Sequence, residues 1–187
     1  MIIKKIIKKF VSLIEQMRPL EKQARNAGCQ IGENNFIASH FWSSEAYLIK
    51  IGNNCQITDN VKFFTHGGGK NVARVKYPKF DCFGKVVIGD YVYIGTGAFV
   101  MPGVTVGNHV LIAAGSVVTK SIPDNCVVAG NPAKFVCTLD EYIDRNLPFN
   151  LDSKGLSLSM KKRLLLSVDQ SKFIRKKKIT IDEKLGN

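Results

Sequence analysis

Residues 87–118 read VIGDYVYIGTGAFVMPGVTVGNHVLIAAGSVV, and an apolar residue recurs there at every sixth position. The same spacing precedes this stretch, so that nine apolar residues occupy one position of a six-residue unit: Ile51, Ile57, Phe63, Ile88, Ile94, Val100, Val106, Ile112 and Val118. A period of six matches neither the 3.6-residue period of an α-helix nor the alternation of an open hairpin sheet. It is typical of a parallel β-helix, in which short strands stack coil upon coil. The sequence therefore predicts an all-β fold of this kind.

A second position of the unit also has a small or apolar residue, four places after the first, and we expect these residues to share the interior: Cys55, Val61, Gly67, Val92, Ala98, Val104, Val110, Ser116 and Ile122. Corners are expected at Gly52, Gly89 and Gly107, where Gly is followed by Asn or Asp, because residues of these types tolerate positive φ. Three units form one coil, and coils stack about 4.8 Å apart. Spacing does not fix the hand of the coil, and the general preference of parallel crossovers favours a right-handed one.

The chain is long enough for one domain with appendages. We expect an N-terminal amphipathic helical segment (1–28), a β-helix domain (29–137) with an inserted loop (69–85), and a C-terminal helix with a basic tail (138–187). The N-terminal helix, which is too short and too charged to span a bilayer or to act as a signal peptide, is expected to cover the open end of the coil. A peripheral contact of the basic ends with an anionic membrane is the alternative.

The net charge of +12 lies mostly at the two ends of the chain. Residues 1–28 hold seven Lys/Arg and two acids, residues 151–187 hold ten and four, and the body between them holds ten and nine. A nucleic-acid enzyme would be expected to concentrate positive charge on its binding face, so nucleic acid is a poor candidate partner. The five cysteines include no Cys-x-x-Cys pair and indicate reduced thiols, hence a cytoplasmic protein.

Three pieces of residues 87–136, PGVTVG, AAGSVVTK and GNPAK, resemble motifs of the hexapeptide-repeat acyltransferases and occur in the same order. Residues 47–69 (YLIKIGNNCQITDNVKFFTHGGG) are similar to the stretch that holds the catalytic histidine in the saccharide O-acetyltransferases of that family, of the maltose, galactoside and capsule types. This resemblance implies a left-handed β-helix, acetyl-CoA as acyl donor and a saccharide acceptor, in surface polysaccharide biosynthesis. It also implies a homotrimer with active sites between subunits.

His66 is the candidate general base for acetyl transfer, because it matches the histidine of the family motif and is followed by a glycine run and an insertion. Capsule-type members often have an acidic residue where this chain has Gly67, so the partner that orients the imidazole is open. Glu45 lies about one coil upstream and could stack over His66. Asp81, in the insertion, corresponds roughly to an acidic loop residue of the sugar acetyltransferases.

The inserted segment 69–85 breaks the six-residue rhythm and includes Tyr77, Phe80 and Phe83. A loop of this length in a regular scaffold is usually functional or disordered, and its aromatic residues argue against plain disorder. We expect it to form a wall of the acceptor pocket that reaches a neighbouring subunit.

The resemblance also implies a donor site. Thr96 matches the position whose backbone N–H faces the thioester oxygen, and lysines near the nucleotide end act as point charges for phosphate. The residues expected to bind acetyl-CoA are Gly95, Thr96, Ala114, Thr119, Lys120 and Lys134.

Other readings of the chain are weaker. The three histidines lie 26 and 43 residues apart, which does not suit a zinc site, so no metal is expected. A serine acetyltransferase shares the coil and the donor, but only about thirty residues precede the first repeat here, too few for its long helical N-terminal region. A trimeric β-helix scaffold without activity is the non-enzymatic alternative, and it gives no reason for His66 to lie beside an aromatic insertion.

Overall fold

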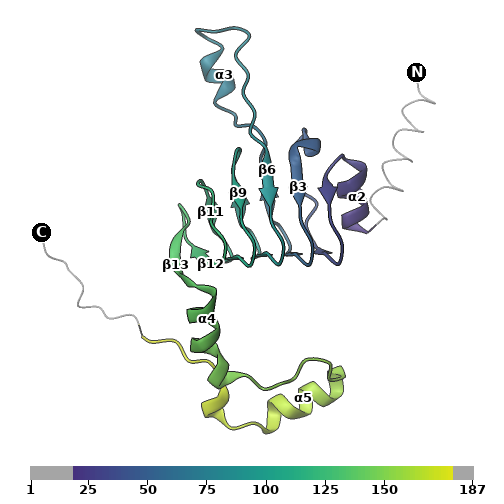
Figure 1. The fold of residues 1–187 in the computed structure, drawn as a ribbon, viewed down its shortest axis with the longest axis vertical. Helices are drawn as coiled ribbons and strands as arrows, with labels where there is room; N and C mark the ends of the chain where they lie inside the picture. Colours follow the sequence, from purple (N-terminus) through teal and green to yellow (C-terminus); the bar gives the residue numbers. More distant parts are fainter. Residues whose placement is uncertain (1–18, 179–187) are drawn as a thin grey trace, which may run out of the picture. The chain divides into compact units, whose positions relative to one another are not determined.

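The computed structural model describes residues 19–178 and divides the chain into two compact units, with the boundary after Leu139. The first unit is a coil of short strands, shown in Figure 1 as a series of stacked turns. The expected amphipathic helix near the start of the chain falls on residues 1–18, outside the described residues.

The strands of the first unit form three sheets, one for each side of the coil. Sheet 1 contains β1 (Gln30–Ile31), β3 (Ile49–Ile51), β6 (Val86–Ile88) and β9 (Thr105–Val106). Sheet 2 contains β2 (Phe36–Ile37), β4 (Gln56–Ile57), β7 (Tyr93–Ile94), β10 (Leu111–Ile112), β12 (Cys126–Ala129) and β13 (Lys134–Thr138). Sheet 3 contains β5 (Lys62–Phe63), β8 (Phe99–Val100) and β11 (Val117–Val118). All paired strands are parallel except β12 and β13, which close the last coil as an antiparallel pair.

The expected six-residue repeat is the core of the coil. All nine apolar residues at the first position of the unit are at most 2% exposed, and they stack in register from coil to coil. The second position is also buried in eight of its nine units. Gly67 is the exception and the expectation was wrong there: Gly67 is exposed, because the chain leaves the coil after the buried Thr65.

The glycines at the corners have a different role from the one expected. Positive φ occurs at the second residue after each of them, at Asn54, Tyr91 and His109, with φ of 56° in all three. Gly52 is required for a steric reason instead, because a Cβ there would lie 2.6 Å from the carbonyl oxygen of Gly89 in the next coil. Only a residue without a side chain allows coils to approach this closely.

The coil is interrupted between β5 and β6. Residues 67–85 leave it as a long loop with one short helix, α3 (Lys70–Ala73), which lies away from the stacked strands in Figure 1. The chain returns at Gly84, whose N–H donates to the carbonyl oxygen of Thr65 over 2.7 Å. A Cβ at Gly84 would lie 2.2 Å from the backbone nitrogen of Gly103, so glycine allows the loop to rejoin the coil.

Besides α3, the described part of the first unit contains the helix α2 (Leu20–Asn26), before the first strand, and the short η1 (Ala46–Leu48). Near the start of the second unit α4 (Leu139–Asn146) occupies the place of the expected C-terminal helix, and η2 (Leu147–Phe149), α5 (Leu158–Ser167) and η3 (Gln170–Lys172) follow. None of the helices in the described part of the chain has the length and apolarity needed to cross a membrane.

Candidate functional site

Strand register brings Glu45 and His66 together. Phe41 pairs in parallel with Lys62 on sheet 3, and four residues after each of these come Glu45 and His66. Because parallel strands advance in step, the two side chains lie above one another at the corner between sheet 3 and sheet 1. The upstream acid that the sequence offered as one of two candidates is therefore the one that contacts the histidine.

The contact between them is short. Nδ1 of His66 lies 2.6 Å from Oε2 of Glu45, and both side chains are partly buried, with 25% and 18% of their surfaces exposed. Hydrogen bonds from Thr65 and His66 outweigh the opposing effect of burial and lower the pKa of Glu45 from 4.5 to about 2. The carboxylate is therefore ionised at neutral pH and accepts a hydrogen bond from the Nδ1–H of His66, which leaves Nε2 as the ring nitrogen with a lone pair in this tautomer.

Thr65 and Ser43 complete the support of the carboxylate, and sequence reasoning missed both. The Thr65 hydroxyl, fully buried, lies 2.8 Å from Oε2 of Glu45 and 2.6 Å from the hydroxyl of Ser43. Ser44 donates to the other carboxylate oxygen over 2.9 Å. The signal available in the sequence was Thr65, a polar residue two positions after the apolar repeat residue Phe63 and directly before His66.

His66 contacts an aromatic ring and is followed by three glycines with open space at their Cα atoms. The ring of Phe83 meets the imidazole edge-on, with centroids 5.9 Å apart and an interplanar angle of 71°. At Gly67, Gly68 and Gly69 an added Cβ would have no atom within 4 Å. Among the described residues Nε2 has no hydrogen-bond partner, so it is available to a substrate hydroxyl.

The structure places Asp81, the other candidate for the orienting acid, in ion pairs within the loop. Its Oδ1 lies 3.4 Å from Nζ of Lys70, and its Oδ2 lies 3.3 Å from Nη2 of Arg74. Neither contact involves His66. In this arrangement Asp81 links the helix α3 to the returning strand of the loop.

The expected thioester-binding residues lie at another corner, between sheet 2 and sheet 3. Gly95 is buried, and a Cβ there would lie 2.4 Å from the backbone nitrogen of Ala114, one coil further along. Thr96 and Ala114 are both exposed at this corner. Within residues 19–178 the backbone N–H of Thr96 has no hydrogen-bond partner, so it can donate to a ligand.

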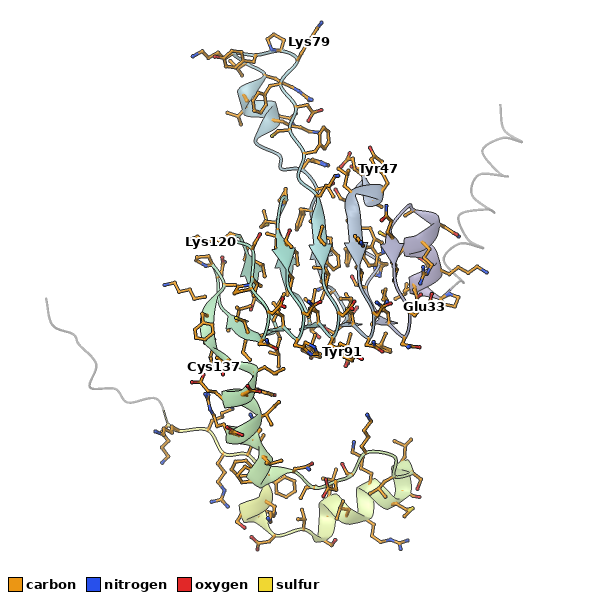
Figure 2. The ribbon with its side chains drawn as sticks, viewed as in Figure 1. Glu33, Tyr47, Lys79, Tyr91, Lys120 and Cys137 are labelled. Carbon is orange, nitrogen blue, oxygen red and sulfur yellow. The ribbon has the colours of Figure 1, made fainter. Side chains whose placement is uncertain are left out.

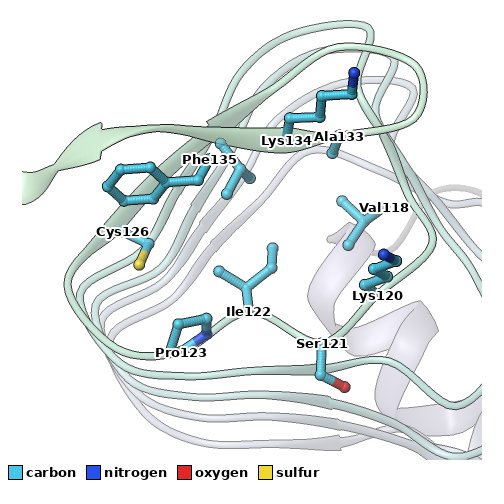
Figure 3. A pocket seen from close by; sticks show the side chains of 10 residues that line it. Val118, Lys120, Ser121, Ile122, Pro123, Cys126, Ala133, Lys134 and Phe135 are labelled. Atoms are coloured by element: carbon cyan, nitrogen blue, oxygen red, sulfur yellow. The ribbon is translucent and has the colours of Figure 1, made fainter.

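Lys120 and Lys134 line a common cavity at the end of the coil, with a volume of about 560 Å³. Figure 3 shows the two lysines on one side of this cavity and Phe135 on the other. Most of the lining is apolar, and the two ammonium groups are its only charged groups. Thr119, the remaining expected donor residue, is exposed at the end of β11, next to Lys120.

Residues 19–178 contain no group of three or more His, Cys, Asp or Glu side chains placed to hold a metal ion. The two corners and the end cavity offer an imidazole, a backbone N–H donor and two ammonium groups.

Comparison with known proteins gives the family. Residues 85–120 match the family model described as bacterial transferase hexapeptide (six repeats). The chain is 40% identical over 150 residues to protein CapG of Staphylococcus aureus, an alignment that covers 79% of this chain and 87% of CapG. It is 33% identical to the galactoside O-acetyltransferase of Escherichia coli K12, with 59% of this chain and 54% of the relative covered.

A solved structure gives the same assignment. A hexapeptide-repeat acetyltransferase of Vibrio cholerae, solved in complex with acetyl-CoA, superposes with a TM-score of 0.52 at 28% identity and covers 60% of this chain and 61% of that one. The chain thus spans most of CapG but only between half and two thirds of the other two proteins. With 87% of CapG covered at 40% identity and the hexapeptide model matched, this chain belongs to the hexapeptide-repeat acetyltransferases.

Proposed function

We propose that this protein transfers the acetyl group of acetyl-CoA to a hydroxyl group of a saccharide, with His66 as the general base. The observation that carries the proposal is the Glu45–His66 pair, 2.6 Å apart where the loop leaves the coil, with no hydrogen-bond partner for Nε2 among residues 19–178. The donor is suggested by the acetyl-CoA bound to the Vibrio cholerae relative, and the acceptor class by the galactoside O-acetyltransferase.

The Glu45–His66 pair can both take a proton from the acceptor hydroxyl and return it to the leaving CoA sulfur. Nε2 of His66 takes the proton of the acceptor hydroxyl as its oxygen attacks the thioester carbonyl carbon. Glu45 stabilises the imidazolium that forms, because its carboxylate is ionised well below neutral pH. When the tetrahedral intermediate collapses and the carbon–sulfur bond breaks, the imidazolium returns the proton to the CoA sulfur.

The donor side of the proposal rests on the second corner and the end cavity. In it the free N–H of Thr96 donates to the developing oxyanion, and Gly95 and Ala114 leave room for the pantetheine arm. Lys120 and Lys134 bind the nucleotide phosphates of CoA as point charges, and Thr119 lies beside them. His66 follows strand β5 and Thr96 precedes strand β8, so the two residues lie beyond opposite ends of the strands of sheet 3. We propose that the His66 corner of one subunit and the Thr96 corner of another subunit form one active site.

We propose that left-handed coils assemble as a homotrimer, in which each active site combines corners of two subunits. The outer face of sheet 3 offers a surface for subunit contact, because its outward residues are largely apolar or aromatic: Phe41, Lys62, Phe64, Phe99 and Val117. Packing this face against a neighbouring coil would bring the His66 corner of one subunit to the Thr96 corner of the next. A fully active monomer in analytical ultracentrifugation would contradict this assembly.

The proposed reaction belongs to the biosynthesis of a surface polysaccharide. Acetylation of a glycan for a surface polysaccharide, at the cytoplasmic side of the membrane, suits the relationship to saccharide acetyltransferases. Residues 29–137 would form the catalytic domain. The appended residues 138–187 carry most of the basic groups that could contact an anionic membrane surface.

The experiment that tests the function measures CoA release from acetyl-CoA with an array of saccharide acceptors and with serine. His66→Ala should lower turnover by about 10²-fold or more, since general-base catalysis contributes on that scale. The matched control is His109→Asn, which replaces another histidine at a corner where Asn also tolerates the positive φ.

The outcomes separate the alternatives. Turnover with a saccharide that depends on His66 and not on His109 supports the proposal. Turnover with serine alone would instead identify a serine acetyltransferase. An absence of acceptor-dependent CoA release from an assembled trimer would indicate a scaffold.

A further inference from the structure

The loop of residues 67–85 concentrates positive charge beside His66. It contains five cationic residues and one acid, a net charge of +4, whereas the rest of residues 29–139 contains four cationic residues and five acids, a net charge of −1. The cationic residues of the loop are Lys70, Arg74, Lys76, Lys79 and Lys85. Since like charges gathered on one segment repel one another, the arrangement favours an anionic partner.

A continuous chain of side-chain contacts connects this loop to His66. Phe83 meets the His66 ring at 5.9 Å, and Nζ of Lys70 lies 5.5 Å from the centre of the Phe83 ring. Lys70 in turn shares Asp81 with Arg74. The loop therefore begins its aromatic and cationic surface at the candidate base itself.

Aromatic and cationic residues also contact one another toward the far end of the loop. Nε of Arg74 donates to the carbonyl oxygen of Phe80 over 2.9 Å, and the Phe80 N–H donates to the carbonyl oxygen of Tyr77 over 2.8 Å. Lys76 lies over the Tyr77 ring at 5.6 Å. Figure 2 shows Lys79 at the end of the loop most distant from the coil.

Several of these side chains are exposed. Tyr77 is 58% exposed, Phe80 39% and Phe83 50%, so the rings cannot be explained as a core of the loop. Among the described residues, Lys76 and Lys79 make no ion pair with an acid. The loop surface is thus a line of exposed rings and unneutralised ammonium groups that starts at His66.

We propose that the acceptor is an acidic oligosaccharide, a chain of several sugar units that carry carboxylate groups, bound along this loop surface. The inference rests on the proposed function and names its substrate class. Aromatic rings provide flat apolar faces for sugar rings, and ammonium and guanidinium groups pair with carboxylates. Asp81 illustrates the second contact, because the loop already holds one carboxylate between Lys70 and Arg74.

The probes are hexagalacturonate, which carries one carboxylate per unit, and maltohexaose, its neutral counterpart in length. Binding of each is measured by calorimetry without acetyl-CoA, and acetyl transfer to each is measured separately. The double variant Lys76→Glu/Lys79→Glu changes only exposed loop residues. Its matched control, Lys22→Glu/Lys50→Glu, changes the net charge by the same amount on α2 and β3.

We expect hexagalacturonate to bind more tightly than maltohexaose and to lose affinity when salt is raised, because exposed ion pairs are screened. The loop variant should weaken hexagalacturonate binding by about tenfold, on the scale of two exposed ion pairs turned repulsive, while the control stays within about twofold. The KM for acetyl-CoA should be unchanged in both variants.

Three outcomes would overturn the inference. The two hexasaccharides could bind equally, or the loop and control variants could lose the same affinity for hexagalacturonate. The loop variant could also raise the KM for acetyl-CoA and leave the affinity for hexagalacturonate unchanged. Selective binding of hexagalacturonate that the loop variant abolishes supports the loop as an acidic-glycan surface, even if transfer is absent and the proposed function fails. Efficient transfer to maltohexaose that the loop variant leaves unchanged rejects the inference and keeps the function.

Discussion

Glycines occur in two regions of the first unit for opposite reasons. At Gly52 and Gly95, in the corners of the coil, a Cβ would lie within 2.6 Å of backbone atoms of the next coil. At Gly67, Gly68 and Gly69, directly after His66, a Cβ would meet nothing within 4 Å. The corner glycines allow the coils to stack, whereas the glycines after His66 keep space open. The same residue type therefore marks the structure in one region and the candidate site in the other.

The largest expected effect is a difference in stability between alanine substitutions in these two regions. Gly52→Ala forces a methyl group against the next coil and should lower the free energy of unfolding by about 3 kcal/mol. Gly68→Ala has room for its methyl group and restricts the unfolded chain, so it should leave stability unchanged or raise it by up to about 1 kcal/mol. Chemical denaturation of both variants measures the difference. Equal destabilisation would show that the glycine run is also part of the packing.

A second prediction concerns the pair at the interrupted corner. Glu45→Gln keeps the size of the side chain but removes the charge that stabilises the imidazolium of His66, so kcat should fall by at least about tenfold. Asp81→Asn, in the loop, is the comparison: a larger loss of kcat there than in Glu45→Gln would assign the orienting role to Asp81.

The lowered pKa of Glu45 predicts a smaller effect, a loss of folding stability at acidic pH. The pKa of Glu45 is lowered from 4.5 to about 2 in the folded protein, chiefly by its hydrogen bond with Thr65. Its contribution is then complete above about pH 4.5 and is lost as the pH falls toward 2. The difference in unfolding free energy between the wild type and Glu45→Gln should shrink over this interval. A difference that stays constant down to pH 2 would contradict the lowered pKa.

The smallest effect should come from a corner of the regular coil. Tyr91 and His109 stack with ring centroids 5.0 Å apart, and both have a positive φ of 56°, where the equivalent residue of another corner is Asn54. The double variant Tyr91→Asn/His109→Asn relieves two unfavourable backbone positions and loses one exposed stack. We expect a rise in unfolding free energy of up to about 1 kcal/mol, measured by thermal denaturation. A clear loss of stability would show that the stack contributes more than the backbone strain.

The repeat was readable because stacked coils impose the same environment every six residues. Each buried position sits in register with its neighbours in the coils before and after it, so the pattern of apolar residues follows directly from the packing. Gly67 could not be placed in this way. The six-residue spacing still fits at Gly67, but the chain leaves the coil at this residue, at a corner where the polar groups of Thr65 and Glu45 bond to each other.

What the sequence determined by itself was the coil, the interruption after β5 and the identity of His66 as the residue at that interruption. The tertiary structure brought Glu45, and not Asp81, into contact with His66, because that contact depends on the register of Phe41 against Lys62 and on the ion pairs of the loop. It also showed that Gly52, Gly89 and Gly107 are required by close contact with the next coil and not by a positive φ. A periodic pattern records an environment shared by many residues, whereas a contact between two side chains at one corner is recorded only by their positions in space.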